Sequence, residues 1–294
     1  PELLAEHLGA VSQALGGATK NVALTVGLED VVLRQVELPP ISLDEMRLVL
    51  KTNAKAYLQQ DFSNPVMDFH VFPQRPSAKS AETPKGSPAS SKVNVLVFGA
   101  KQQLIDDIQM AVKSAGLVAH CIIPGVISPV NAFEISVPEA FAGESVMLVD
   151  IGFKQTSVCV VDRGELVLTR VVNLGGTRLT AGLAEAMSIS YAEAEGIKVG
   201  MAPEVHSMLE MQIIPLGREL RASLDFVEHQ RDRPVSQVYL SGGSAQSEMI
   251  LQMLHSEMFV ECKTWNPTQS LQLSLSETQA AEIVHVGSQL TVAI

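Results

Sequence analysis

The 294-residue chain is 46% hydrophobic, which is enough to bury a core larger than that of one small domain. Its 32 acidic residues outnumber its 21 basic ones, and the formal net charge of −11 argues against a broad nucleic-acid surface, because phosphate binding needs clustered Lys and Arg. No run of about 18 apolar residues is present, so no helix is expected to insert into a membrane. The three cysteines are widely spaced, form no CxxC pair and fit a reducing compartment such as the cytoplasm.

Neither end of the sequence has the features of a natural terminus. The chain begins at Pro1 without an initiator Met or a signal peptide, and it stops at Ile294 inside an apolar run. We therefore expect it to be part of a longer protein.

The first 119 residues predict alternating helices and strands. The expected elements are a helix over 1–15, strands over 22–26 and 31–38, a helix over 42–58, strands over 68–72 and 93–98, and a helix over 102–115. Ser42 and Glu45 have the spacing of a capping box, which predicts where the second helix begins. Residues 73–92 hold four prolines and five serines and predict a mobile linker.

The second half begins with three strands joined by short turns, which predict an antiparallel meander. The expected elements are strands over 146–151, 157–161 and 166–172, helices over 178–187, 190–198 and 204–230, a strand over 238–240 followed by a helix, a strand over 261–265 and a helix over 277–286. Ser190 and Glu193 form a second capping-box spacing. Pro215 is expected to kink or divide its helix.

Asp150-Ile-Gly152 lies at the turn between two of these strands, and Thr156 opens the second strand. A glycine turn lets the backbone approach a phosphate, to which its amides and the Thr156 hydroxyl can donate, while Asp150 can hold a metal-bound water. Asp150 is the only candidate that the sequence offers for a catalytic group. An ordinary tight hairpin also favours Asp and Gly, so both interpretations stay open.

Glycine pairs occur at two further corners. Gly242 and Gly243 follow a strand within the segment SGGSA, where a flat ligand such as adenosine could lie close to the backbone beside Ser244. Gly175 and Gly176 precede a helix. At both places a plain connection that needs unusual backbone angles also explains the glycines.

Glu195 and Lys198 are three residues apart and share one face of a helix. They form either a surface ion pair, which stabilises little, or a clamp on a ribose and a base. The seven histidines show no HxH or HExxH spacing, so metal catalysis has no support.

The order of these motifs resembles the actin-like ATPase fold: strand–DIG–strand, GG before a helix, a Glu–Lys helix, then strand–SGG–helix. The DIG and SGGSA segments look like its second phosphate loop and its adenosine motif. Within this superfamily the chain most resembles the PilM family of type IV pilus assembly proteins, which is itself similar to FtsA. The segments that carry this resemblance are QVELP at 35–39, NAKAY at 53–57, NLGGTRLT at 173–180 and LGRELRASLDF at 216–226.

The resemblance implies an α/β fold of the actin-like, ribonuclease H-like type, with two lobes and an inserted small α/β subdomain. The expected parts are an incomplete first lobe (1–28, 120–145 and 274–294), an inserted subdomain (29–119), a second-lobe core (146–173 and 234–273) and a helical subdomain of the second lobe (174–233).

The resemblance also implies a nucleotide, ATP or ADP with Mg²⁺, and at most a slow ATPase. The implied nucleotide-binding residues are Asp150, Gly152, Lys154, Thr156, Gly175, Gly176, Glu195, Lys198, Gly242, Gly243 and Ser244, with Asp150 holding the metal through water. The implied function is that of a cytoplasmic scaffold beneath the inner membrane. It would bind the N-terminal tail of a PilN-like membrane protein in a groove of the inserted subdomain and its neighbour, and form a homo-oligomer or ring, without nucleic acid and without direct membrane insertion.

The chain departs from the family in two ways. The first phosphate loop has no counterpart near the N-terminus, and Phe153-Lys154-Gln155 replaces the small and hydroxyl residues usual in the second loop. The site is therefore either incomplete here or degenerate. The alternatives are an active ATPase or sugar-kinase-like phosphotransferase, for which no base beyond Asp150 is evident, and a scaffold of type II secretion or cell division. The central expectation is that the corners at Gly152 and Gly242 face each other across a crevice between two lobes.

Overall fold

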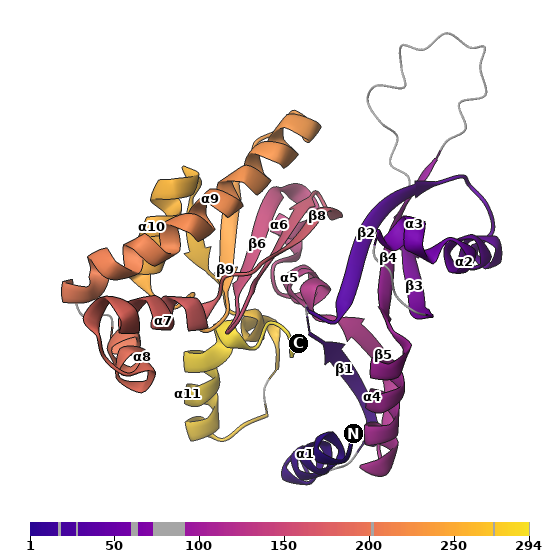
Figure 1. The fold of residues 1–294 in the computed structure, drawn as a ribbon, viewed down its shortest axis with the longest axis horizontal. Helices are drawn as coiled ribbons and strands as arrows, with labels where there is room; N and C mark the ends of the chain where they lie inside the picture. The colour runs from indigo at the N-terminus through magenta and orange to yellow at the C-terminus, as the bar shows by residue number, and fades with distance from the viewer. Residues whose placement is uncertain are drawn as a thin grey trace. The chain divides into compact units, whose positions relative to one another are not determined.

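The computed structural model describes residues 1–16, 19–27, 29–59, 64–72, 92–200, 203–272 and 274–293. They form two compact units, Pro1–Pro124 and Gly125–Ile294, and many of their helices and strands are labelled in Figure 1. The linker expected over 73–92 lies outside the described residues except for Lys92. The division into four parts remains a prediction.

The first unit contains two separate sheets. Strand β1 (Asn21–Val26) pairs in parallel with β5 (Val118–Pro124). The other sheet is antiparallel and has the order β2-β4-β3, from Val31–Leu38, Val93–Lys101 and Pro65–Val71. Helix α1 (Glu2–Ala14) contacts α4 (Gln102–Ser114).

The capping box at Ser42 is confirmed, since its hydroxyl accepts from the Glu45 amide and the Glu45 carboxylate accepts from the Ser42 amide. The helix that it opens is divided at Asn53 into α2 (Leu43–Thr52) and α3 (Ala54–Leu58). The division turns Leu58 onto the sheet, where a Cβ on Gly99 would come within 2.4 Å of its Cδ1. The core of this sheet consists of Leu38, Met46, Leu50, Leu58, Val95 and Val97.

The second unit is built on a five-stranded sheet with the order β10-β9-β6-β7-β8. The strands are β6 (Ser145–Ile151), β7 (Thr156–Asp162), β8 (Glu165–Val172), β9 (Gln237–Ser241) and β10 (Cys262–Thr264). The predicted meander is confirmed, because β6, β7 and β8 pair antiparallel, whereas β9 and β10 add in parallel on the other side of β6. All residues of β7 are buried, as expected for a strand covered on both faces.

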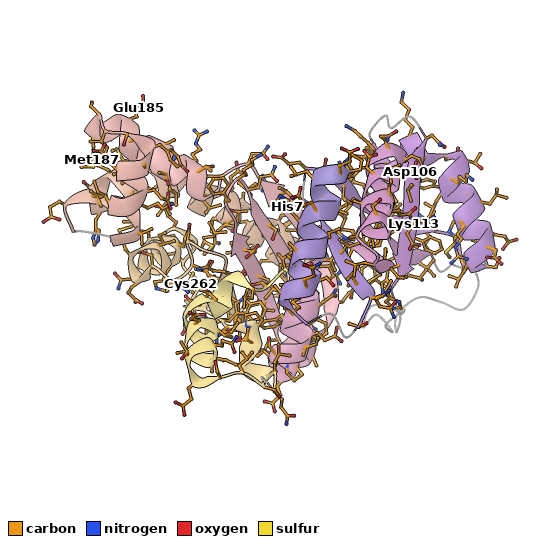
Figure 2. The ribbon with its side chains drawn as sticks, turned by 90° about the horizontal axis from the view of Figure 1, so that it is seen from below. His7, Asp106, Lys113, Glu185, Met187 and Cys262 are labelled. Atoms are coloured by element: carbon orange, nitrogen blue, oxygen red, sulfur yellow. The ribbon has the colours of Figure 1, made fainter. Side chains whose placement is uncertain are left out.

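Helices cover both faces of this sheet. Met147, Val149 and Ile151 of β6 belong to the core formed with α7 (Gly176–Met187), α8 (Tyr191–Gly200), α9 (His206–Arg231) and α10 (Glu248–Met258). Successive side chains of a strand point to opposite faces of the sheet, so the residues between these core positions lie on the other face. On that face, Phe133 of α5 packs on Tyr239 with ring centroids 4.5 Å apart. Figure 1 shows α9 and α10 side by side, and Figure 2 shows Glu185 and Met187 at the carboxyl end of α7.

Pro215 does not divide α9, which runs without a break from His206 to Arg231. The ring lies on the exposed side of the helix, while buried residues on both sides of it hold the helix on the sheet. Those residues are Leu209, Ile213, Leu216, Leu220 and Leu224. The burial of these side chains therefore stabilises the helix more than the loss of one backbone hydrogen bond at Pro215 destabilises it.

The remaining elements of the second unit are helices and short 3-10 turns. They are η2 (Gly125–Ile127), α5 (Ser128–Ser136), α6 (Pro138–Gly143), η3 (Pro203–Val205), η4 (Pro267–Ser270), α11 (Glu277–Val286) and η5 (Gly287–Gln289). Strand β5 and helices α5 and α6 fill a stretch for which the sequence predicted no element. The helix expected after SGGSA begins only at Glu248, with Ser247 as its N-cap.

Candidate functional site

The candidate site lies where β6 and β9 end. These strands are parallel neighbours, so their carboxyl ends meet at one edge of the sheet, and Asp150 is in register with Ser241. The Ser241 hydroxyl donates to Oδ1 of Asp150 over 2.9 Å. Ligands in open α/β sheets bind at this edge.

Gly242 makes the close approach of the two corners possible. Its φ is +93°, and a Cβ at this position would lie 2.3 Å from the carbonyl oxygen of Ile151. Its amide donates to the Ser288 carbonyl over 2.8 Å, which brings η5 to the same corner. The corners at Gly152 and Gly242 are therefore adjacent in one sheet, and the expectation that they face each other across a crevice between two lobes was wrong.

The turn between β6 and β7 is fixed to the start of α7. The Gly176 amide donates to the Gly152 carbonyl over 2.9 Å, and the Thr177 amide donates to the Phe153 carbonyl over 2.8 Å. A Cβ on Gly175 would lie 2.6 Å from the Gln155 amide nitrogen, so glycine is required for this contact. The first amides of α7 are thus already engaged.

The side chains of this turn differ in their exposure to solvent. Thr156 is fully buried, and its hydroxyl donates to the Leu174 carbonyl over 2.6 Å. A phosphate contact from Thr156 would require that bond to break. Lys154 and Phe153 are exposed, and 68% of Phe153 is accessible to solvent.

Glu195 and Lys198 do form an ion pair, with 2.8 Å between Oε2 and Nζ, but it is not a plain surface pair. Lys198 is 8% exposed, and its ammonium also donates to Thr180 Oγ1 over 2.8 Å and reaches the Gly176 carbonyl at 3.4 Å. The Thr180 hydroxyl contacts Glu195 in turn. The network joins α8 to the first turn of α7.

Some of the predicted nucleotide-binding residues lie close to one another, whereas Gly243 lies apart from the side chains of the others. Gly176 links the corners to the ion pair, because a Cβ there would lie 3.4 Å from Ser244 Oγ and 3.7 Å from Lys198 Nζ. Gly243 is exposed, and a Cβ on it would meet no atom within 4 Å, so the backbone here is open.

Burial raises the pKa of Asp150 above its ordinary value, although the hydrogen bond from Ser241 lowers it in part. For Glu195, burial acts to raise the pKa, but the hydrogen bonds from Lys198 and Thr180 and the charge of Lys198 outweigh it and hold the pKa below its ordinary value. Burial, together with the charge of Asp150, raises the pKa of Cys159 to about 12.

Sequence reasoning missed Thr180 and Ser288 as parts of this site. Thr180 lies one helical turn after Gly176, a spacing that could have indicated it. No local signal indicates Ser288, whose contact with Gly242 joins distant parts of the chain.

Within the described ranges, no three His, Cys, Asp or Glu residues are grouped closely enough to hold a metal ion. No helix that the structure describes is both long and apolar enough to cross a bilayer.

Comparison with solved structures supports the fold. The chain is similar to a structure described as "PilM-PilN type IV pilus biogenesis complex", with a TM-score of 0.81 and 22% identity over 100% of this chain and 83% of that chain. Lower likenesses are to the ethanolamine utilization protein EutJ from Carboxydothermus hydrogenoformans (TM-score 0.44, 19% identity, 64% and 57% of the two chains) and to MreB 5 of Spiroplasma citri bound to AMPPNP (TM-score 0.44, 12% identity, 56% and 60%).

The molecule has the actin-like ATPase fold, as the order of its motifs predicted. A model of the family described as "Type IV pilus assembly protein PilM" matches residues 1–294. The chain belongs to this family, and the resemblance read from its sequence is confirmed.

Proposed function

We propose that the protein is a cytoplasmic scaffold of a type IV pilus machine that binds the N-terminal tail of a PilN-like membrane protein. The observation that carries this proposal is the family match over residues 1–294. The likeness along the whole chain to the protein in a PilM–PilN complex supports it further. On this proposal the partner, rather than a segment described here, brings the protein to the inner membrane.

The tail would bind to the first unit, within the part expected to form the inserted subdomain and its neighbour. The edges of one sheet in this unit favour an extended peptide. In the sheet β2-β4-β3, both β2 and β3 are edge strands, and an edge offers backbone donors and acceptors to an added strand. A scaffold that binds in this way needs no rapid turnover of nucleotide.

A nucleotide, ATP or ADP with Mg²⁺, would lie at the carboxyl ends of β6 and β9. The open backbone at Gly243 supports this, because a ligand could lie against it without meeting a side chain. Asp150 would hold a metal-bound water, Lys154 would pair with phosphate oxygens, and Glu195 with Lys198 would contact the ribose. The nucleotide itself would supply charge that organises these residues.

Co-purification tests the scaffold proposal. The protein, carrying an affinity tag, is co-expressed with a PilN-like membrane protein, either intact or lacking the residues before its membrane helix. The intact partner is expected to be retained and the shortened one to be lost. Retention of both forms, or of neither, would contradict the proposal.

A further inference from the structure

Helices α7 and α8 lie side by side in the second unit (Figure 1), and Lys198 of α8 is buried where the two helices meet. Its ammonium donates to Thr180 Oγ1 and to Glu195 Oε2, each over 2.8 Å, and it lies 3.4 Å from the Gly176 carbonyl oxygen. An ammonium has three protons, and the third of these contacts is at the outer limit of a hydrogen bond. One proton of Lys198 can therefore turn to a ligand oxygen beside Gly176.

The space beside Gly176 is lined by polar atoms. A Cβ on this glycine would lie 3.4 Å from Ser244 Oγ, 3.7 Å from Lys198 Nζ and 3.8 Å from the Gly152 carbonyl oxygen, which belong to three different segments of the chain. A ligand hydroxyl suits these atoms, because it can accept from the ammonium and donate to the carbonyl. A phosphate oxygen suits them less, since the carbonyl oxygen would repel it.

Thr180 fixes the direction of the lysine side chain. It is fully buried, and its hydroxyl is within reach of the Gly176 carbonyl and of the Glu195 carboxylate. A hydroxyl has one proton, and donation to the carboxylate gives the stronger bond. The hydroxyl oxygen is then the acceptor that holds the Lys198 ammonium on α7.

Without this acceptor the ammonium would follow Glu195. Both partners of the ion pair lie on α8, and the Glu195 side chain is 41% exposed, so the pair can also form nearer to solvent. The four-carbon stem of lysine is flexible enough for this movement. Loss of the one hydroxyl oxygen at position 180 would therefore carry the positive charge away from the space beside Gly176.

We propose that Thr180 is a positioning residue that makes the nucleotide site selective for ribonucleotides over deoxyribonucleotides. It holds Lys198 where the ammonium meets a ribose hydroxyl beside Gly176, and Thr180 itself does not touch the ligand. This selectivity rests on the nucleotide site proposed above, for which it names the class of sugar.

Equilibrium dialysis of the folded protein with Mg-ATP and with its 2′-deoxy and 3′-deoxy forms tests the selectivity. ATP is expected to bind at least about tenfold more tightly than one of the two deoxy forms, because a hydrogen bond to a charged group is lost. Equal binding of all three nucleotides would overturn the role of Thr180 and leave the nucleotide site in place. Binding of none of them would contradict the nucleotide site as well.

Variants at position 180 separate positioning from folding. Thr180→Val loses the oxygen and is expected to reduce the preference for ATP to less than about threefold, while Thr180→Ser keeps the hydroxyl and should preserve it. Thr180→Ala is a second variant without the oxygen and is expected to lose the preference in the same way. Their Tm values show whether each variant is folded.

A double-mutant cycle identifies the group through which Thr180 acts. In the Lys198→Met protein, Thr180→Val should leave the ratio of the ATP and deoxy-ATP affinities unchanged, because both substitutions act through one ammonium. If Thr180→Val and Thr180→Ala instead weaken ATP and its deoxy forms by the same factor, Thr180 acts on the fold alone and the proposal is overturned.

Discussion

The Ser241 hydroxyl lies 2.9 Å from Oδ1 of Asp150 and joins the carboxyl ends of two parallel strands, β6 and β9. This bond places the only candidate catalytic carboxylate between a glycine turn and a glycine-containing corner. Burial disfavours the ionised form of Asp150 and raises its pKa, and the hydrogen bond from Ser241 opposes this only in part.

Replacing Asp150 with Asn is expected to raise the Tm of the ligand-free protein by a few degrees at neutral pH. Burial raises the pKa of Asp150 in the folded state, so stability falls as the pH rises from the unfolded-state pKa through the folded-state pKa, and the cost is fully present above it. Asparagine keeps the acceptor for Ser241 without the charge. Thermal unfolding at several pH values checks this, and a gain that persists unchanged in acid would contradict it.

Mg-ATP is expected to raise the Tm of the protein, because a ligand at about 100 times its Kd stabilises the folded state by about 2.7 kcal/mol. The shift should be absent in Asp150→Asn, although that variant is the more stable one without ligand. Asp106→Asn is the matched control, since Asp106 is exposed on α4 and is labelled in Figure 2. A full Tm shift in Asp150→Asn would show that Asp150 does not take part in binding Mg-ATP.

Gly242→Ala is expected to lower the free energy of unfolding by about 3 kcal/mol. The reason is the positive φ together with a Cβ position 2.3 Å from a backbone oxygen, which cannot move away as a side chain can. Gly243→Ala, one residue further on, meets open space and should change stability by less than about 0.5 kcal/mol. Urea denaturation distinguishes them, and equal effects would contradict the geometry of this corner.

Lys198→Met is expected to lower the free energy of unfolding by about 2 kcal/mol, because it leaves Thr180 and Glu195 without their shared cation. Glu195→Gln should have a smaller effect, since Glu195 is 41% exposed and can be hydrated. The pKa of Glu195 is lowered in the fold, so its contribution is present above the unfolded-state pKa and is lost as the pH falls through the folded-state pKa. The pH profile of Glu195→Gln should accordingly be flatter in that window, and an unchanged profile would count against the network.

Pro215→Ala is expected to raise the free energy of unfolding by about 1–3 kcal/mol, because it restores a backbone donor on the exposed side of α9. Arg218→Ala, also on the exposed side, should change it by no more than about 0.5 kcal/mol. A loss of stability in Pro215→Ala, measured in urea, would show that the ring itself contributes packing.

Local patterns predicted much of the second unit. Strict alternation and short glycine turns identified the meander, and the spacing of Ser190 and Glu193 located the start of α8. Residues 117–145 gave no such pattern, because α5 buries Pro129, Val130, Ala132 and Phe133 and lacks a clear polar face. Periodicity identifies a half-exposed helix far better than a buried one.

The arrangement of the candidate site could not be predicted from the sequence. The sequence analysis expected the corners at Gly152 and Gly242 to face each other across a crevice, whereas the glycines at 152, 175, 176 and 242 lie together at one edge of a single sheet. The Thr156 hydroxyl is engaged by Leu174, 18 residues away, and local sequence carries no signal for that contact. Hydrogen bonds between distant segments depend on the packed sheet and become visible only in the fold.

Calorimetric titration of a synthetic N-terminal tail from a PilN-like membrane protein into the folded chain tests the proposed scaffold most directly. Saturable heat with one tail bound per chain, and none from a peptide of the same composition in scrambled order, is the expected result. An absence of heat from the tails of all PilN-like proteins encoded beside this gene, with the protein shown to be folded, would contradict it.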